Sequence, residues 1–137
     1  GIAPAIMAAL QFNVPCLFAK KAKPSTLTQD VYHADIHSFT KNTTSTVIVS
    51  NEFLAKDDRV LIIDDFLANG DASLGLNEIV KQAQASTAGV GIVIEKSFQP
   101  GRQRLEDAGL RVSSLCKVAS LQGNKVTFAS EEVGTQI

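Results

Sequence analysis

Two adjacent aspartates, Asp64 and Asp65, are the residues of this chain whose type and position most clearly predict chemistry. They follow four apolar residues at 60–63, a pattern typical of a strand buried in a parallel sheet. A turn of small residues follows at 68–72, and then the apolar periodicity of a helix over 73–85. Ligands of open α/β sheets bind at such a corner, beyond the carboxyl ends of the strands.

The turn and the acidic pair predict the two halves of one ligand. Small residues at 68–72 allow backbone amides to approach an anion closely, and the start of the following helix favours a phosphate. Asp64 and Asp65 would instead accept hydrogen bonds from hydroxyl groups or hold hydrated Mg²⁺. A phosphate at one end and sugar hydroxyls at the other describe a ribose 5-phosphate, so we expect a ligand of that kind.

Other interpretations of the acidic pair stay open. An apolar strand that ends in two aspartates also begins receiver domains, which need a third Asp at the end of a later strand. Asp107 instead falls in a helical stretch, so that interpretation fits poorly. Because adjacent strand residues point to opposite faces, one of Asp64 and Asp65 could have a structural role instead of contacting a ligand.

The segment 60–72 resembles the phosphoribosyl-pyrophosphate (PRPP) motif of type I phosphoribosyltransferases. The resemblance extends to residues 95–101 and to the opening residues 1–5, is greatest to the bacterial enzymes that act on xanthine, and covers nearly the whole chain. It implies one α/β domain over 1–137, with a twisted, mainly parallel sheet flanked by helices and a β-hairpin with a mobile loop. It also implies a homodimer.

The resemblance implies displacement of pyrophosphate from C1 of PRPP by a purine nitrogen, with Mg²⁺ on the leaving diphosphate and no organic cofactor. Asp64 and Asp65 would contact the ribose hydroxyls and the water shell of Mg²⁺, without a metal site built from protein ligands alone. Lys96 would bind an oxygen of the purine, since an ammonium only donates, and Phe98 would cover the base. The 5-phosphate would be held by the loop residues Ala68, Asn69, Gly70, Asp71 and Ala72.

The loop departs from the commoner family pattern. Ala68 stands where hypoxanthine–guanine enzymes carry an Asp, which argues against that subfamily, but adenine enzymes have Ala there too. Asn69 and Ala72 each replace a Thr, so two hydroxyl donors are lost. Asp71 would repel a phosphate if it pointed inward, and we expect it to point outward and cap the helix start. Lys96 favours xanthine over adenine, because the ammonium suits an oxopurine.

Two clusters of ionisable residues could bind a ligand or could simply be solvent-exposed surface residues. Lys20 and Lys21 precede the segment 24–30, where the family has a mobile catalytic loop, so one of them would contact the diphosphate unless both belong to a solvated basic turn. His33 and His37 fall in an extended segment and have no obvious third ligand, so we interpret them as surface or hairpin residues and not as a metal site.

Hydrophobic periodicity and breaker residues predict the remaining elements. We expect a helix at 4–12, a strand at 16–19, hairpin arms at 31–39 and 43–50, a strand at 88–94, a short helix at 100–109, a strand at 110–118 and a turn with a last short strand within 121–128.

Composition narrows the functional classes. The chain has 137 residues, of which 45% are hydrophobic and 20% charged, so it can bury a core as one domain. A net charge of −1 gives no support for nucleic-acid binding, and no apolar run approaches the roughly 20 residues of a membrane span. We find no signal peptide and expect Cys16 and Cys116 to be reduced core residues of a cytoplasmic protein.

The chain begins at Gly1 without Met. In the family, a strand end with the pyrophosphate loop and a hood over the base precede this Gly, so we expect a truncation, which would leave this chain inactive. A second hypothesis is a PRPP-sensing repressor of purine operons, which has this fold and a DNA-binding domain before it. A third is a phosphoribosyltransferase for another purine, adenine or guanine.

Overall fold

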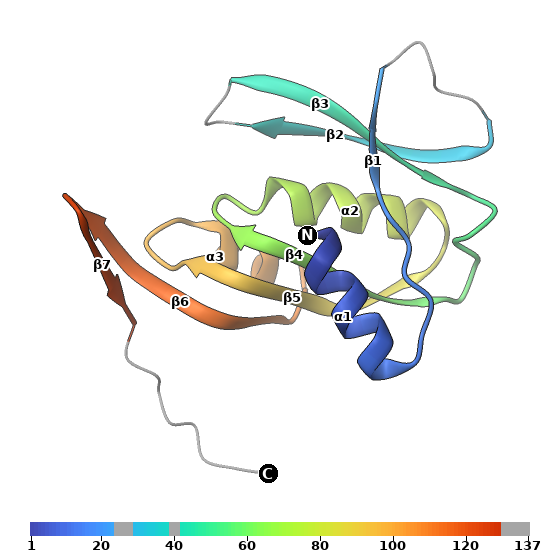
Figure 1. Ribbon diagram of the computed structural model, residues 1–137. Helices are drawn as coiled ribbons and strands as arrows, with labels where there is room; N and C mark the ends of the chain where they lie inside the picture. Colours follow the sequence, from blue (N-terminus) through green and yellow to red (C-terminus); the bar gives the residue numbers. More distant parts are fainter. Residues whose placement is uncertain (24–28, 39–41, 130–137) are drawn as a thin grey trace.

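The apolar segment that carries the acidic pair is an edge strand of a four-stranded sheet in the computed structural model, which describes residues 1–23, 29–38 and 42–129. Figure 1 labels the elements along the chain. They are α1 (Ile2–Phe12), β1 (Lys20–Ala22), β2 (Val31–Ser38), β3 (Thr43–Ser50), β4 (Arg59–Leu67), α2 (Asp71–Gln82), β5 (Ser86–Lys96), α3 (Gly101–Asp107), β6 (Val112–Gln122) and β7 (Lys125–Phe128).

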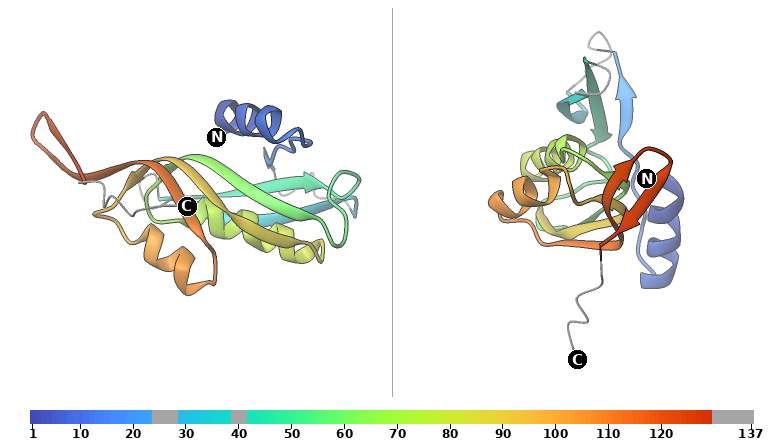
Figure 2. Two further views of the ribbon diagram at one scale, coloured as in Figure 1. Left: turned by 90° about the horizontal axis from the view of Figure 1, so that it is seen from below. Right: turned by 90° about the vertical axis from the view of Figure 1, so that its left-hand side faces the viewer.

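The main sheet has the strand order β4-β5-β6-β7. Its β4–β5 and β5–β6 pairs are parallel, and β7 adds an antiparallel edge. Helices α2 and α3 lie on one face of this sheet and α1 lies on the other (Figure 2). Because β4 and β5 are parallel and adjacent, their carboxyl ends place the segments after Leu67 and after Lys96 at the same edge.

The second sheet is antiparallel, has the order β1-β3-β2, and packs against α2 (Figure 1). Helix α2 therefore lies between the two sheets, which explains the apolar stripe along it. Gly75 is needed at this contact, because a Cβ there would lie 2.7 Å from Cγ1 of Ile36 on β2. The cluster on this side consists of Val47, Val49, Leu54, Ile79 and Ala83.

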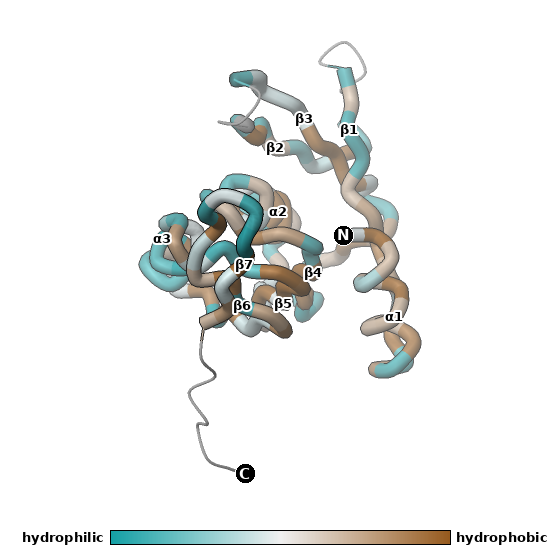
Figure 3. Tube along the Cα trace, turned by 60° about the vertical axis from the view of Figure 1, so that its left-hand side comes forward, coloured by the Kyte–Doolittle hydropathy of each residue, from teal (hydrophilic) through white to brown (hydrophobic). Residues whose placement is uncertain are grey.

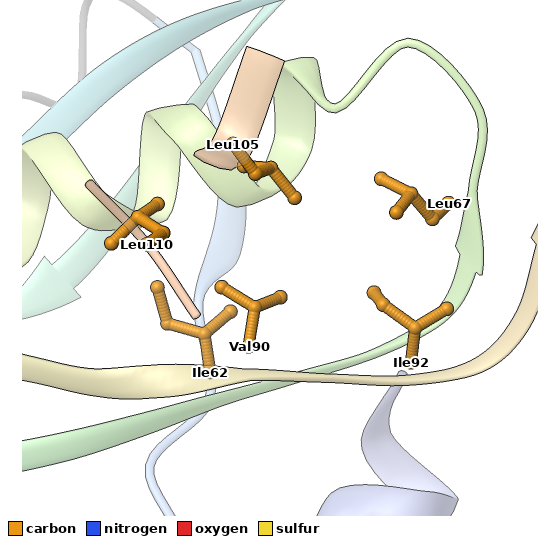
Figure 4. Packing of buried hydrophobic residues seen from close by; sticks show 6 residues of the cluster. All are labelled: Ile62, Leu67, Val90, Ile92, Leu105 and Leu110. Carbon is orange, nitrogen blue, oxygen red and sulfur yellow. The ribbon is translucent and has the colours of Figure 1, made fainter. Parts of the chain in front are cut away.

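A second cluster fills the space between the main sheet and α3 (Figure 4). It is built from branched residues of β4 and β5 and from leucines in and after α3, and Figure 3 shows hydrophobic stretches along these two strands. Its members are Ile62, Leu67, Val90, Ile92, Leu105 and Leu110. This packing holds α3 beneath the strand ends that carry the candidate site.

Leu105 is 0% exposed and is the main anchor of α3 on the sheet. We expect Leu105→Ala to lower the free energy of unfolding by roughly 2 to 3 kcal/mol, since the substitution leaves a cavity that a short helix can partly close. Urea titration of this variant beside Leu115→Ala measures the effect, because Leu115 is 84% exposed and its loss should cost less than about 0.5 kcal/mol. Equal losses in the two variants would contradict this view of the core.

The structure confirms the predicted α/β class and corrects several boundaries. The strand expected at 16–19 lies at Lys20–Ala22 instead, where pairing with β3 is available. The strand before the acidic pair does not end at residue 63 but continues to Leu67, because β5 pairs with it along that whole length. The helix expected from residue 73 begins at Asp71. Most of the loop predicted at 24–30 lies outside the described residues.

Other expectations concern burial. Cys16 and Cys116 are free thiols, as expected, but both are only half-buried and are not core residues.

Asp107 is the last residue of α3 and does not end a strand, which agrees with the argument against a receiver domain. No helix within the described ranges is long and apolar enough to cross a membrane.

Candidate functional site

The acidic pair occupies the last part of β4. Asp64 and Asp65 have side-chain exposures of 21% and 56%, as expected for neighbours on opposite faces of a strand. Each carboxylate folds back onto the strand: Asp64 Oδ1 accepts from the amide of Asp65 at 2.9 Å, and Asp65 Oδ1 accepts from the amide of Phe66 at 3.1 Å. These bonds fix both carboxylates close to the main chain at the strand end.

Both carboxylates converge on the start of α1. The amino nitrogen of Gly1 lies 3.6 Å from Asp64 Oδ1 and 3.5 Å from Asp65 Oδ1. A Cβ on Gly1 would lie 2.8 Å from Asp64 Oδ1 and 2.9 Å from the carbonyl oxygen of Ile63, so only glycine allows this approach. Both carboxylates thus lie near the start of α1, but only Asp64 is among the residues that line a hollow at the first turn of α2.

The two carboxyl groups titrate as a pair. Burial, followed by the side-chain hydrogen bond with Asp65, raises the pKa of Asp64. The same hydrogen bond, with Asp64 as partner, lowers the pKa of Asp65. As the pH falls, Asp64 therefore takes up a proton while Asp65 remains an anion. One ionised carboxylate is thus retained for hydroxyl groups or a hydrated cation.

The small-residue loop lies directly beyond the acidic pair and leads into α2. Gly70 has φ of +84°, which glycine adopts without strain, and its carbonyl accepts the amide of Leu74 at 2.9 Å. The loop borders a hollow of about 170 Å³ at the first turn of α2. This hollow is lined by Ile36, His37, Asp64 and the run from residue 66 to residue 73.

The hollow brings together residues that the sequence assigned to one ligand. Asp64 and the predicted phosphate loop, residues 68–72, both line it, but Asp65 is not among its lining residues. His37 reaches it from β2 although it was interpreted as a plain hairpin residue, and its Nδ1 lies 3.2 Å from Oγ1 of Thr44. A larger hollow of about 400 Å³ beside the end of α1 has no charged group among its described lining residues, so it fits neither half of the ligand.

Helix α3 is hydrogen-bonded to the phosphate loop, residues 68–72. The amide of Gly101 donates to the carbonyl oxygen of Ala68 at 2.9 Å, and a Cβ on Gly101 would overlap that oxygen. Arg104 donates through Nη1 to the carbonyl oxygen of Asn69 and, at 2.9 Å, to Asp71 Oδ1. The loop is thus fixed by main-chain and side-chain bonds to one helix.

The expectation that Asp71 caps α2 is wrong. In the described part of the chain Gly70 is the N-cap residue, no side chain caps this helix, and Asp71 is the first helical residue. Its carboxylate instead binds Arg104, a partner 33 positions away in the sequence. A negative side chain in the first turn still suits the helix dipole.

Lys96 ends β5 at the same edge of the sheet. Its Nζ lies 5.9 Å from the centroid of the Phe66 ring, a cation–π contact, and Phe66 itself lines the hollow. Phe98 follows on an exposed turn. The structure therefore brings Lys96 to Phe66, but neither Lys96 nor Phe98 is among the residues that line the hollow, and their expected roles toward a purine stay predictions.

Glu95 pairs with Arg102 and not with its neighbour Lys96. Glu95 is 2% exposed and binds Arg102 through two bonds, Nη2 to Oε2 at 2.6 Å and Nε to Oε1 at 2.9 Å. Ser114 donates to Oε2 at 2.5 Å. Burial alone would raise the pKa of Glu95, but the hydrogen bonds from Arg102 and Ser114 outweigh it and lower that pKa. This buried ion pair ties α3 to β5 and β6.

Sequence reasoning missed Arg102 and Arg104. Both are ordinary charged residues of a short helix, and their partners lie on other elements. Two arginines spaced two positions apart on a helix point in different directions, and their partners depend on which elements pack against each side. No local sequence pattern would therefore have identified Arg102 and Arg104 as site residues.

Lys20 and Lys21 lie on β1, paired with β3, and neither lines the hollow as the structure describes it. A contact of Lys21 with the diphosphate stays a prediction. His33 and His37 both lie on β2, and among the described residues no group of three possible ligands could hold a metal ion. Both histidines lie on an arm of the hairpin, and His37 also lines the hollow.

Comparisons with known proteins identify close relatives. No family model matches the chain. It is 81% identical over 132 residues to a xanthine phosphoribosyltransferase of Staphylococcus saprophyticus and 80% identical over 131 residues to one of Staphylococcus epidermidis. Each alignment covers 96% of this chain and 68% of the relative.

Solved structures show the same fold at lower identity. An adenine phosphoribosyltransferase of Rhodothermus marinus superposes with a TM-score of 0.73 at 22% identity, covering 85% of this chain and 64% of its own. One of Thermoanaerobacter pseudethanolicus superposes with a TM-score of 0.70 at 21% identity, covering 82% of this chain and 62% of its own. This chain thus spans about two thirds of the length of the proteins that it matches.

Proposed function

This chain belongs to the xanthine phosphoribosyltransferase family, and from this premise we propose that it acts in purine salvage, transferring the 5-phosphoribosyl group of PRPP to N9 of xanthine. The products would be xanthosine 5′-monophosphate and pyrophosphate. The observation that carries the proposal is the 81% identity to an enzyme of that name over 96% of the chain. The hollow that Asp64 and the phosphate loop line supports this proposal, because PRPP would bind there.

The phosphate loop would bind the 5-phosphate of PRPP. Its members are small, its backbone turns at Gly70, and it opens the 12-residue helix α2, whose first amides favour an anion. Asp64 and Asp65 would accept hydrogen bonds from the ribose hydroxyls, because an ionised carboxylate is an acceptor only. Held at both ends, the ribose would present C1 to the purine in a fixed orientation.

Mg²⁺ is the cation we propose for the diphosphate. Two adjacent carboxylates without a third ligand side chain in the described residues suit an ion that keeps several waters and is bound mainly by its substrate. When bound, Mg²⁺ would neutralise charge on the leaving diphosphate. Asp65, which stays ionised to lower pH, is the better candidate of the pair for orienting that water shell.

Lys96 would select the purine. Its ammonium can only donate hydrogen bonds, so it complements the oxygen of an oxopurine and opposes the amino group of adenine. The cation–π contact with Phe66 would hold it at the edge of the hollow. Phe98, exposed on the next turn, would cover the base. We further propose a cytoplasmic homodimer, in keeping with the family resemblance.

The test is pyrophosphate release from PRPP with Mg²⁺ and, separately, xanthine, guanine, hypoxanthine and adenine. It is run on this chain and on a chain extended to the length of its relatives. We expect xanthine to give the highest kcat/KM in the extended chain. A higher kcat/KM with adenine or guanine than with xanthine would overturn xanthine as the proposed substrate. No pyrophosphate release by either chain with any of the four purines would overturn the proposed activity.

Lys96→Gln tests the selecting residue. We expect kcat/KM for xanthine to fall roughly 10- to 100-fold, as for loss of a hydrogen bond from a charged donor, with little change in the KM for PRPP. Lys125→Gln, on the exposed strand β7, serves as the control and should match the parent. An equal loss with Lys96→Gln for xanthine and adenine would show that Lys96 does not discriminate between them.

A further inference from the structure

The phosphate loop contains a carboxylate, which is unexpected beside a bound phosphate. Asp71 lines the hollow and is the first residue of α2, in the turn whose amides would bind the 5-phosphate. An unpaired negative charge there would repel the ligand, and partial burial of Asp71, 19% exposed, would strengthen the repulsion. Some other group must therefore neutralise this carboxylate if the loop is to bind a phosphate.

Arg104 is that group. Its Nη1 donates to Asp71 Oδ1 at 2.9 Å and also to the carbonyl oxygen of Asn69. The first bond balances the charge of the carboxylate. The second binds a carbonyl oxygen of the loop, so that this oxygen faces the cation. One guanidinium thus acts on both the charge and the conformation of the loop.

Helix α3 is itself fixed firmly enough to serve as a support. Gly101 at its start bonds to Ala68, and Gly70 approaches it so closely that a Cβ on Gly70 would lie 3.2 Å from the carbonyl oxygen of Gly101. Arg102 binds the buried Glu95 on the other side. Arg104 is therefore presented from a helix that is bonded to the main sheet and to the loop at once.

We propose that Arg104 is a positioning residue for PRPP binding, which cancels the charge of Asp71 and holds the carbonyl of Asn69 so that the loop accepts the 5-phosphate. This inference rests on the proposed function. It assigns Asp71 and Arg104 to one unit: the arginine is required because the carboxylate is present. A variant that lacks both charges should therefore bind PRPP better than one that lacks the arginine alone.

The experiment measures equilibrium binding of PRPP with Mg²⁺, and the KM for PRPP, in the chain extended to the length of its relatives. The variants are Arg104→Gln, Arg104→Lys and the double variant Arg104→Gln/Asp71→Asn, with Arg111→Gln, an exposed arginine, as control. We expect Arg104→Gln to raise both constants at least tenfold with kcat within about threefold of the parent. The double variant should recover most of this loss, and Arg104→Lys should lie between.

The pattern of outcomes separates this inference from the function on which it rests. Parent protein that binds no PRPP overturns both. Parent that binds PRPP, with Arg104→Gln unchanged, overturns the inference alone. A double variant no better than Arg104→Gln also overturns it, because a merely structural role of Arg104 would not be relieved by removing the carboxylate. If Arg104→Gln does not fold, Asp71→Asn alone decides: Arg104 still holds the carbonyl of Asn69 and the loop has lost a negative charge, so the inference requires PRPP binding at least as tight as in the parent, and weaker binding overturns it.

Discussion

Replacement of either Asp64 or Asp65 by Asn is expected to lower kcat/KM for PRPP by about a hundredfold, the usual cost of removing one preorganised electrostatic contact from an active site. The amide keeps the size of the side chain but loses the negative charge that would hold the ribose hydroxyls and the hydrated Mg²⁺. Pyrophosphate release at saturating xanthine measures the effect. Asp107→Asn, at the end of α3 away from the hollow, is the matched control.

The pH dependence of the reaction should report the same pair. Because burial and the bond to Asp65 raise the pKa of Asp64, this carboxyl is the first of the two to be protonated as the pH falls. It should therefore set the acidic limb of the kcat/KM profile, and the limb should move to lower pH in Asp64→Asn. An unchanged limb in that variant would show that the protonation of Asp64 does not limit the reaction.

Loss of the buried ion pair should have the largest effect on stability. We expect Glu95→Ala to lower the free energy of unfolding by about 3 kcal/mol, because it removes a buried carboxylate that binds both the partly buried Arg102 and Ser114. Urea unfolding measures this. The control is Glu78→Ala, which breaks the exposed pair with Lys81 and should cost less than about 0.5 kcal/mol.

The same residue predicts how stability depends on pH. The folded-state pKa of Glu95 lies below the ordinary value of 4.5, so the ionised form contributes stability above that value. This contribution is lost as the pH falls through the folded-state pKa. Relative to Glu95→Gln, the parent should be more stable at pH 7, and the difference should shrink below 4.5. A difference that stays constant from neutral to acidic pH would contradict a charged Glu95.

The ion pair of Glu95 also bears on the site. Glu95 directly precedes Lys96, and its bonds to Arg102 and Ser114 fix the end of β5 on α3 and β6. Glu95→Gln should therefore impair the use of xanthine more than the binding of PRPP, since the phosphate loop is held separately through Arg104. Purine KM and PRPP KM, measured together, check this order.

The sequence by itself determined the parts of this protein that depend on neighbours along the chain. The apolar run at 60–63 predicted a strand and the small residues after it a close turn before a helix, but the expected burial of the run was wrong, since Ile62 is buried while Leu61 is 42% exposed on an edge strand. Together with residues 95–101 they were enough to predict the α/β class and the family, because a phosphate loop is a continuous segment. The apolar stripe of α2 likewise predicted an amphipathic helix with one apolar face, although not that two sheets cover it.

Only the tertiary structure decided what each charged side chain contacts. Asp71 was expected to cap its own helix, but its carboxylate instead binds Arg104, which lies 33 positions away in the sequence. Glu95 is buried because Arg102 and Ser114 meet it from two other elements, and His37 reaches the hollow from the hairpin. Strand ends were decided in the same way, since β4 continues to Leu67 as long as β5 offers it hydrogen bonds. Local patterns contain no information on such partners, because the contacts exist only once the sheet and its helices have packed.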